Sequence, residues 1–197
     1  MRVAPSDPGG ELATNQGLSV NAVASTGVAS PVADQVVLAP AATALTHSQI
    51  TGWRTQSVVE RLAREHDLVV IDSPPHAETE ARIAVRAASL VIVPIQPSPM
   101  DLWATQPTID LARQEKVPVL LVLNRVPPHT KVSAAIIAQV TALGQPPAVR
   151  LAQGRIGNRA AYAGALYEGR SVTESARPSD AGREIAALAA EILATPA

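Results

Sequence analysis

Runs of consecutive aliphatic residues, bounded by polar residues or prolines, dominate the chain after residue 50. Three such runs lie at residues 68–71, 89–95 and 117–123, and a shorter one lies at 148–151. Aliphatic runs without polar alternation are typical of strands buried on both faces of a parallel sheet. The pattern therefore predicts a sheet whose strands are covered by helices on either side.

Between these runs, apolar residues recur three and four positions apart, which predicts amphipathic helices. The predicted helices lie at residues 52–65, 77–88, 98–114, 130–143, 162–167 and from 179 onward. Strands that alternate with helices of 10 to 15 residues favour parallel crossover connections. The fold class predicted is α/β, with a doubly wound, mostly parallel sheet.

Two helices carry specific signals. Ser98 as N-cap, Pro99 at the first helical position and Asp101 at the third predict where the helix after the second long run begins. The last helix is predicted to begin after Ser179 and to present one apolar face. The residues of that face are Ile185, Leu188, Ala189, Ile192 and Leu193.

Polar residues end the three long runs, at Asp72, Gln96 and Asn124. In a parallel sheet the carboxyl ends of these strands meet at one edge, where open α/β folds bind their ligands. Asp72 is followed by Ser73 and two prolines, which prevent a helix from starting at once. Two interpretations remain open: a carboxylate presented to a nucleotide-bound magnesium ion, or an ordinary aspartate that caps a turn.

The first 50 residues differ in kind from the rest. They contain only four charged residues, although the chain has 16 basic and 17 acidic ones. They show no helical or strand period, and only residues 36–38 suggest a short strand before Pro40. We therefore expect an irregular, weakly ordered N-terminal segment at 1–50 and an α/β domain at 51–197.

Composition narrows the functional classes. The chain has 197 residues, a net charge of −1 and no cysteine, which excludes disulfides, thiolate metal sites and a cysteine nucleophile. No apolar run approaches the roughly 18 residues of a membrane span, and no signal peptide is visible, so we expect a cytoplasmic protein. Lysine occurs only at Lys116 and Lys131.

Residues 51 to about 195 resemble the ParA-type partition ATPases, which belong to the deviant Walker branch of the P-loop NTPases together with MinD-like proteins. The segments that carry the resemblance are 67–75, 82–88, 90–101 and 169–174. It implies a P-loop NTPase-like fold and ATP hydrolysis with ATP and Mg²⁺ as cofactors. It also implies plasmid or chromosome partition, a nucleotide sandwich dimer, non-specific DNA binding, a centromere-binding partner protein and a nucleoid-associated location. The last helix has Arg183 as its one base, so we expect no membrane anchor.

The resemblance assigns roles to single residues. Asp72 would be the catalytic Walker B residue and would help hold magnesium, and Asn124 would contact adenine through an amide that both donates and accepts. The other residues carried over are Arg125 and Pro97 near the nucleotide, and Arg155, Arg159 and Arg170 near phosphates of DNA or nucleotide. The alternatives are that Asn124 only forms a turn and that the arginines are solvated surface residues.

The phosphate loop departs from the family pattern. The family reads Lys-Gly-Gly-x-Gly-Lys-Thr-Thr, whereas Gly9, Gly10 and Thr14 are the nearest match here, with both lysines and the third glycine missing. They are either a remnant of the loop or a chance match. Without a lysine to meet charge developing on the phosphates, hydrolysis should be very slow. The alternatives are a truncated or frame-shifted product, a degenerate paralogue, or a non-enzymatic adaptor that keeps its dimer and partner surfaces.

Overall fold

The computed structural model describes residues 18–24, 44–50, 54–72, 78–128, 131–144, 146–176 and 178–195. The chain divides into two compact units, residues 1–87 and 88–197. The predicted remnant residues Gly9, Gly10 and Thr14 and the candidate strand at 36–38 lie outside the described residues. Among the described helices, none is both long and apolar enough to cross a membrane.

The first unit contains a three-stranded sheet in the order β2-β1-β3. Its strands are β1 (Leu18–Ala24), β2 (Ala44–Ile50) and β3 (Leu68–Asp72), and its helices are α1 (Thr55–Glu65) and α2 (Glu78–Ala87). A small core joins Ile50, Val59 and Leu62, with Val69 and Ile71 of β3 packed against it. The amphipathic pattern that predicts α1 thus buries its apolar face against this sheet.

β3 corrects two predictions. It pairs with β1 in antiparallel register, from Ser19 opposite Asp72 to Val23 opposite Leu68, where the sequence predicts a strand of a parallel sheet. Burial also alternates along it, because Leu68 and Val70 are 36% and 48% exposed. One face of this antiparallel sheet packs on α1 and the other does not, and an aliphatic run alone does not distinguish this arrangement from two-sided burial.

β1 and β2 lie within the first 50 residues, where the sequence pattern predicts neither strand. Their backbones pair along seven residues each, from Leu18 opposite Ile50 to Ala24 opposite Ala44. In β1 apolar and polar residues alternate only from Leu18 to Ala22, and β2 mixes them without alternation, so the signal for a strand is weak. Backbone pairing with each other and with β3 therefore defines these strands more than their side-chain pattern does.

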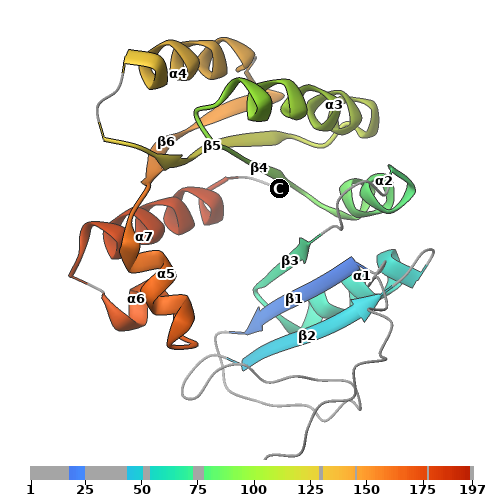
Figure 1. The fold of residues 1–197 in the computed structure, drawn as a ribbon. Helices are drawn as coiled ribbons and strands as arrows, with labels where there is room; N and C mark the ends of the chain where they lie inside the picture. The colour runs from blue at the N-terminus through green and yellow to red at the C-terminus, as the bar shows by residue number, and fades with distance from the viewer. Residues whose placement is uncertain are drawn as a thin grey trace, which may run out of the picture. The chain divides into compact units, whose positions relative to one another are not determined.

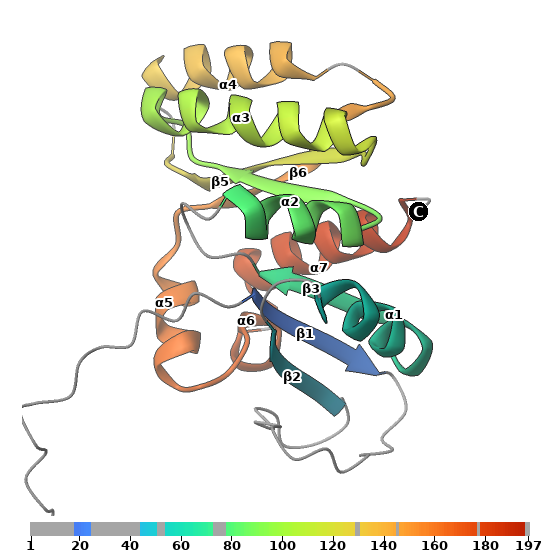
Figure 2. The ribbon, with the colours of Figure 1, turned by 90° about the vertical axis from the view of Figure 1, so that its right-hand side faces the viewer.

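The second unit contains the parallel sheet β4-β5-β6, which confirms the α/β class. Its strands are β4 (Val91–Ile95), β5 (Val119–Val126) and β6 (Val149–Gly157); its helices are α3 (Pro99–Glu115), α4 (Lys131–Leu143), α5 (Ala160–Tyr167), α6 (Val172–Ser175) and α7 (Asp180–Leu193). Figures 1 and 2 show α3 and α4 on one face of this sheet and α7 on the other. The carboxyl ends of β4 and β5 lie at one edge, as predicted.

The aliphatic run of β5 has the two-sided burial that the sequence predicts. Residues 119 to 123 are all buried. Leu120 and Val122 face Ala152 and Ile156 of β6, with Ile185, Leu188 and Ile192 of α7 packed against them. Of the predicted α7 face, Ala189 and Leu193 are instead exposed. The face that meets the sheet is rotated toward Glu184 and Glu191, whose carboxylates bond to β6.

The start of α3 confirms its predicted cap. The Ser98 hydroxyl accepts a hydrogen bond from the Asp101 amide at 3.2 Å and donates one to the Asp101 carboxylate at 2.9 Å. The same carboxylate accepts from the Gln96 amide at 2.9 Å. The Gln96 amide and the Ser98 hydroxyl are thereby satisfied by one aspartate, which fixes how the chain leaves the sheet and enters the helix.

We predict that Leu121→Ala destabilises the protein by about 3 kcal/mol, because Leu121 is fully buried in β5 and its truncation leaves a cavity. Leu166→Ala is the matched control, since Leu166 is 79% exposed and should cost less than about 0.5 kcal/mol. Urea denaturation followed by circular dichroism measures both. Equal effects in the two variants would contradict the placement of β5 at the centre of this core.

Candidate functional site

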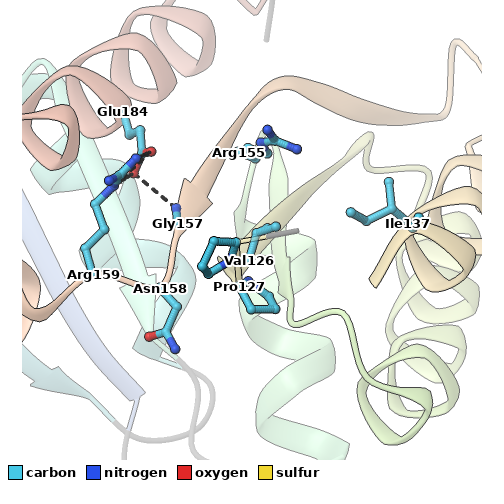
Figure 3. A pocket seen from close by; sticks show the side chains of 10 residues that line it. Val126, Pro127, Ile137, Arg155, Gly157, Asn158, Arg159 and Glu184 are labelled. Carbon is cyan, nitrogen blue, oxygen red and sulfur yellow. Dashed lines mark hydrogen bonds and ion pairs between the residues drawn. The ribbon is translucent and has the colours of Figure 1, made fainter. Parts of the chain in front are cut away.

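A pocket lies at the carboxyl ends of β5 and β6, which we call the strand-end pocket (Figure 3). Its volume is about 370 Å³. The apolar wall comes from the end of β5, the two prolines after it and α4, and the polar wall comes from the end of β6, the two residues after it and α7. The lining residues are Val126, Pro127, Pro128, Ala134, Ile137, Arg155, Gly157, Asn158, Arg159 and Glu184.

A single carboxylate organises the polar wall. Glu184 of α7 accepts hydrogen bonds from the Gly157 amide at 3.0 Å, from the Tyr162 hydroxyl at 2.9 Å and from Arg159 Nη2 at 2.6 Å. Figure 3 shows Glu184 and Arg159 facing each other beside Gly157. Arg159 also contacts Asp180 at 3.3 Å. Arg159, which the family resemblance assigns to phosphates, is thus held between two carboxylates.

These contacts shift two pKa values in opposite directions. The hydrogen bond from Arg159, helped by the Gly157 amide and the Tyr162 hydroxyl, outweighs burial and lowers the pKa of Glu184 from 4.5 to about 2. Burial first, then the hydrogen bond to Glu184 and its negative charge, raise the pKa of Tyr162 from 10.0 to about 12. The contribution of Glu184 to stability is therefore lost as pH falls from 4.5 toward 2, and that of Tyr162 as pH rises from 10 toward 12.

Asn124 lies just before the pocket, at an irregular place in β5. Leu123 pairs with Arg155 and Val126 with Gly157, so two residues of β5 lie opposite one of β6. Arg125, inside this bulge, has φ of +50°, which is a strained conformation for a residue with a side chain. The side-chain oxygen of Asn124 accepts a hydrogen bond from the Arg125 amide at 2.9 Å. The amide that lines the pocket is that of Asn158 instead.

β6 has a second irregularity, and there too a carboxylate of α7 accepts a hydrogen bond from a backbone amide of β6, as Glu184 does from Gly157. Between the pairs Leu121 with Leu151 and Leu123 with Arg155, β6 has extra residues. The Gln153 amide there donates to both carboxylate oxygens of Glu191, at 3.0 and 3.1 Å. Glu184 and Glu191 are seven residues apart, two turns on one face of α7, and the sequence analysis did not identify either. Two acids beside the apolar stripe of an amphipathic helix were the available signal.

The other residues that the family resemblance assigns to the site lie on different elements of the structure. Arg155 lines the strand-end pocket. Arg170 is exposed after α5 and donates from its guanidinium to the Glu174 carbonyl at 3.3 Å. Pro97 lies between β4 and α3, inside a tight turn in which the Ser98 amide donates to the Gln96 carbonyl at 2.7 Å. Asp72 is the exposed last residue of β3, in the first unit.

The residues present fit parts of a magnesium–ATP site. An exposed carboxylate at a strand end, such as Asp72, is a suitable magnesium ligand, because Mg²⁺ takes one or two carboxylates together with water and phosphate oxygens. Within the described ranges no three His, Cys, Asp or Glu side chains gather as a ready metal site. Lys116 caps the end of α3 in a left-handed conformation, so it belongs to no glycine-rich phosphate loop.

Comparison with known proteins connects this geometry to a family. A family model described as "ATPase MipZ" matches residues 17–115, a range that includes β1 and β2 and so extends the resemblance in front of residue 51. "Maintenance of carboxysome distribution protein A" of Halothiobacillus neapolitanus is 32% identical over 135 residues, which cover 65% of this chain and 61% of that protein. This chain therefore spans less than two thirds of that relative's length. Since the family match covers half of the chain, the chain belongs to the ParA-type ATPases, the group that includes the ATPase MipZ family.

Proposed function

We propose that this chain is a ParA-type positioning protein that binds an adenine nucleotide weakly in the strand-end pocket and hydrolyses it slowly or not at all. The observation that carries the proposal is the pocket itself, at the carboxyl edge of a parallel sheet in a chain of this family. Open α/β folds bind nucleotides at that edge.

The lining of the pocket suits a purine base. Val126, Pro127 and Ile137 supply apolar surface for the faces of a ring, and the Asn158 amide supplies one donor and one acceptor for its edge. The volume of about 370 Å³ lies within the range of small-molecule sites. Asn124, two residues before Val126, is the second candidate for this contact, on the ground of the family resemblance.

Slow hydrolysis follows from the sequence. A phosphate loop needs a lysine that reaches the β- and γ-phosphates, and the first lysine of this chain is Lys116. The family resemblance gives Asp72 the role of helping to hold magnesium, which would offset negative charge on the phosphates. The lysine that shares this task in the family is missing, so the transition state for phosphoryl transfer is less stabilised. Gly9, Gly10 and Thr14 remain candidates for a remnant loop.

The cargo and partners are proposed from the family. We propose plasmid or chromosome partition through a sandwich dimer, non-specific DNA and a centromere-binding partner, in the nucleoid region of the cytoplasm. The second class of cargo that we propose is the carboxysome, on the ground of the name of the carboxysome distribution relative.

For DNA contact we propose Arg155 and Arg170. Both are exposed, and neither has a carboxylate within ion-pair distance among the contacts resolved for the described residues. Arg159 differs, since Glu184 and Asp180 offset its charge.

A non-enzymatic adaptor is the second candidate function, and the missing lysines favour it. An adaptor would bind its partner equally well with and without nucleotide. A positioning protein that works through its nucleotide would bind the partner differently in the two conditions, so a pull-down with ATP and without it separates the two.

We predict that Asn158→Ala weakens the binding of a fluorescent ATP analogue about 10-fold, because a hydrogen bond to the base edge contributes roughly 1 to 1.5 kcal/mol. Gln139→Ala, which removes an exposed amide from α4, should leave the affinity unchanged. Fluorescence titration measures both. If Asn124→Ala weakens binding and Asn158→Ala does not, the base edge is read from the end of β5 and the assignment to Asn158 is wrong.

We predict that the purified chain shows no steady-state ATP hydrolysis above that of Asp72→Ala, since the phosphate-contacting lysine is missing. Release of inorganic phosphate at saturating ATP and Mg²⁺ is the measurement. Robust turnover that disappears in Asp72→Ala would contradict slow hydrolysis and would reveal a phosphate site that this chain builds without lysine.

We predict that Arg155→Ala and Arg170→Ala each reduce the salt dependence of duplex DNA binding by about one phosphate contact. Arg159→Ala should leave the salt dependence unchanged, because carboxylates already offset that charge. Fluorescence anisotropy over a series of salt concentrations gives the slopes. A reduced slope in Arg159→Ala alone would overturn this assignment.

A further inference from the structure

We propose that Glu184 is the positioning residue of the strand-end pocket: it holds residues 157–159 in the shape that receives the base. The inference rests on the proposed function, because it concerns how the same pocket recognises its ligand. Glu184 itself need not touch the nucleotide, since it acts through the wall that it holds.

The wall consists of Gly157, Asn158 and Arg159, which are the last residue of β6 and the two that follow it. Glu184 bonds to the first of these through its backbone amide and to the third through its guanidinium. Asn158 lies between them, and its backbone amide donates a hydrogen bond to the Val126 carbonyl of β5 at 2.9 Å. The backbone of Asn158, which carries the side chain toward the pocket, is thus held by contacts immediately before and after it and by the neighbouring strand.

These contacts leave little room at the wall. A Cβ atom added at Gly157 would lie 3.1 Å from Arg159 Nε and 3.4 Å from a Glu184 carboxylate oxygen, so a larger residue there would force this ion pair to shift by a few tenths of an ångström. The Glu184 side chain is only 19% exposed, compared with 38% for Arg159. An acid this shielded, with donors from a backbone amide, a guanidinium and a phenol, is held in one geometry.

The same helix provides a matched control. Glu191 also accepts from a backbone amide of β6, that of Gln153, and it lies two turns along the same face of α7. Both acids therefore attach α7 to an irregular part of β6 by the same kind of bond. Only Glu184 lines the strand-end pocket, whereas Glu191 does not. A purely structural role would be shared by both acids, and a positioning role would belong to Glu184 alone.

The first test is the binding of a fluorescent ATP analogue to the full chain, in competition with unlabelled ATP and GTP. We expect Glu184→Ala to weaken binding about 10-fold and to reduce the preference for adenine over guanine, because the wall that presents Asn158 is released. Glu191→Ala should change neither by more than about 2-fold. Glu184→Gln keeps an oxygen that accepts from the Gly157 amide, so it should recover part of the affinity.

The second readout is spectroscopic and reports whether the network exists. Tyr162 and Tyr167 are the two tyrosines of the chain, so Tyr167→Phe leaves Tyr162 as the one phenol. In that background, phenolate absorbance read directly after a jump to high pH should give a pKa of about 12. Adding Glu184→Ala should lower this pKa toward 10, and adding Glu191→Ala should not.

The outcomes separate the two claims. Equal losses of nucleotide affinity in Glu184→Ala and Glu191→Ala, or no loss in Glu184→Ala, would overturn the positioning role and leave the proposed function intact. Wild-type protein that binds no adenine nucleotide would overturn the proposed function and this inference with it. Should Glu184→Ala not fold, Glu184→Gln against Glu191→Gln carries the test, with the larger loss expected in Glu184→Gln.

Discussion

The second unit depends on two hydrogen bonds between backbone amides of β6, at Gln153 and Gly157, and carboxylates of α7. β5 and β6 do not stay in register to their ends, and at these irregular parts the Gln153 and Gly157 amides of β6 donate to carboxylates of α7. Such an amide needs an acceptor, since leaving it without one costs roughly as much as a lost hydrogen bond. Glu184 and Glu191 of α7 provide these acceptors. The helix is therefore attached to the sheet by two polar bonds as well as by its apolar face.

The hydrogen bonds of Glu184 also place an ion pair, Glu184 with Arg159, at the strand-end pocket. Because the hydrogen bond from Arg159 lowers the pKa of Glu184 to about 2, the carboxylate stays ionised at neutral and mildly acidic pH and holds Arg159 close to Gly157. The guanidinium then contributes order to the pocket wall more than it contributes free positive charge. This separates Arg159 from Arg155 and Arg170, although the three look alike in the sequence.

Under the proposed function, nucleotide recognition divides into two parts, the binding of the base and the binding of the phosphates. The base side has a formed pocket with apolar walls and an amide at its edge. The phosphate side depends on residues that the family supplies from a glycine- and lysine-rich loop, and this chain has no lysine before Lys116. Base binding without efficient phosphoryl transfer is the combination that this division favours, and it suits a protein that senses a nucleotide or occupies its site without consuming it.

The sequence by itself determined the elements that local pattern controls. Aliphatic runs located β3, β4 and β5, helical spacing located α1 to α4, and the Ser98, Pro99 and Asp101 signals defined the start of α3, because each depends on residues within a few positions of one another. Tertiary structure alone decided which strand pairs with which. β3 joins β1 in an antiparallel sheet, and β1 and β2 form although the signal for a strand is weak in both. It also decided the site, where Asn158 rather than Asn124 lines the pocket and Glu184 lies 27 residues after the Gly157 amide that it accepts from. Contacts between residues so far apart depend on how α7 packs against β6, and no local pattern in the chain records that.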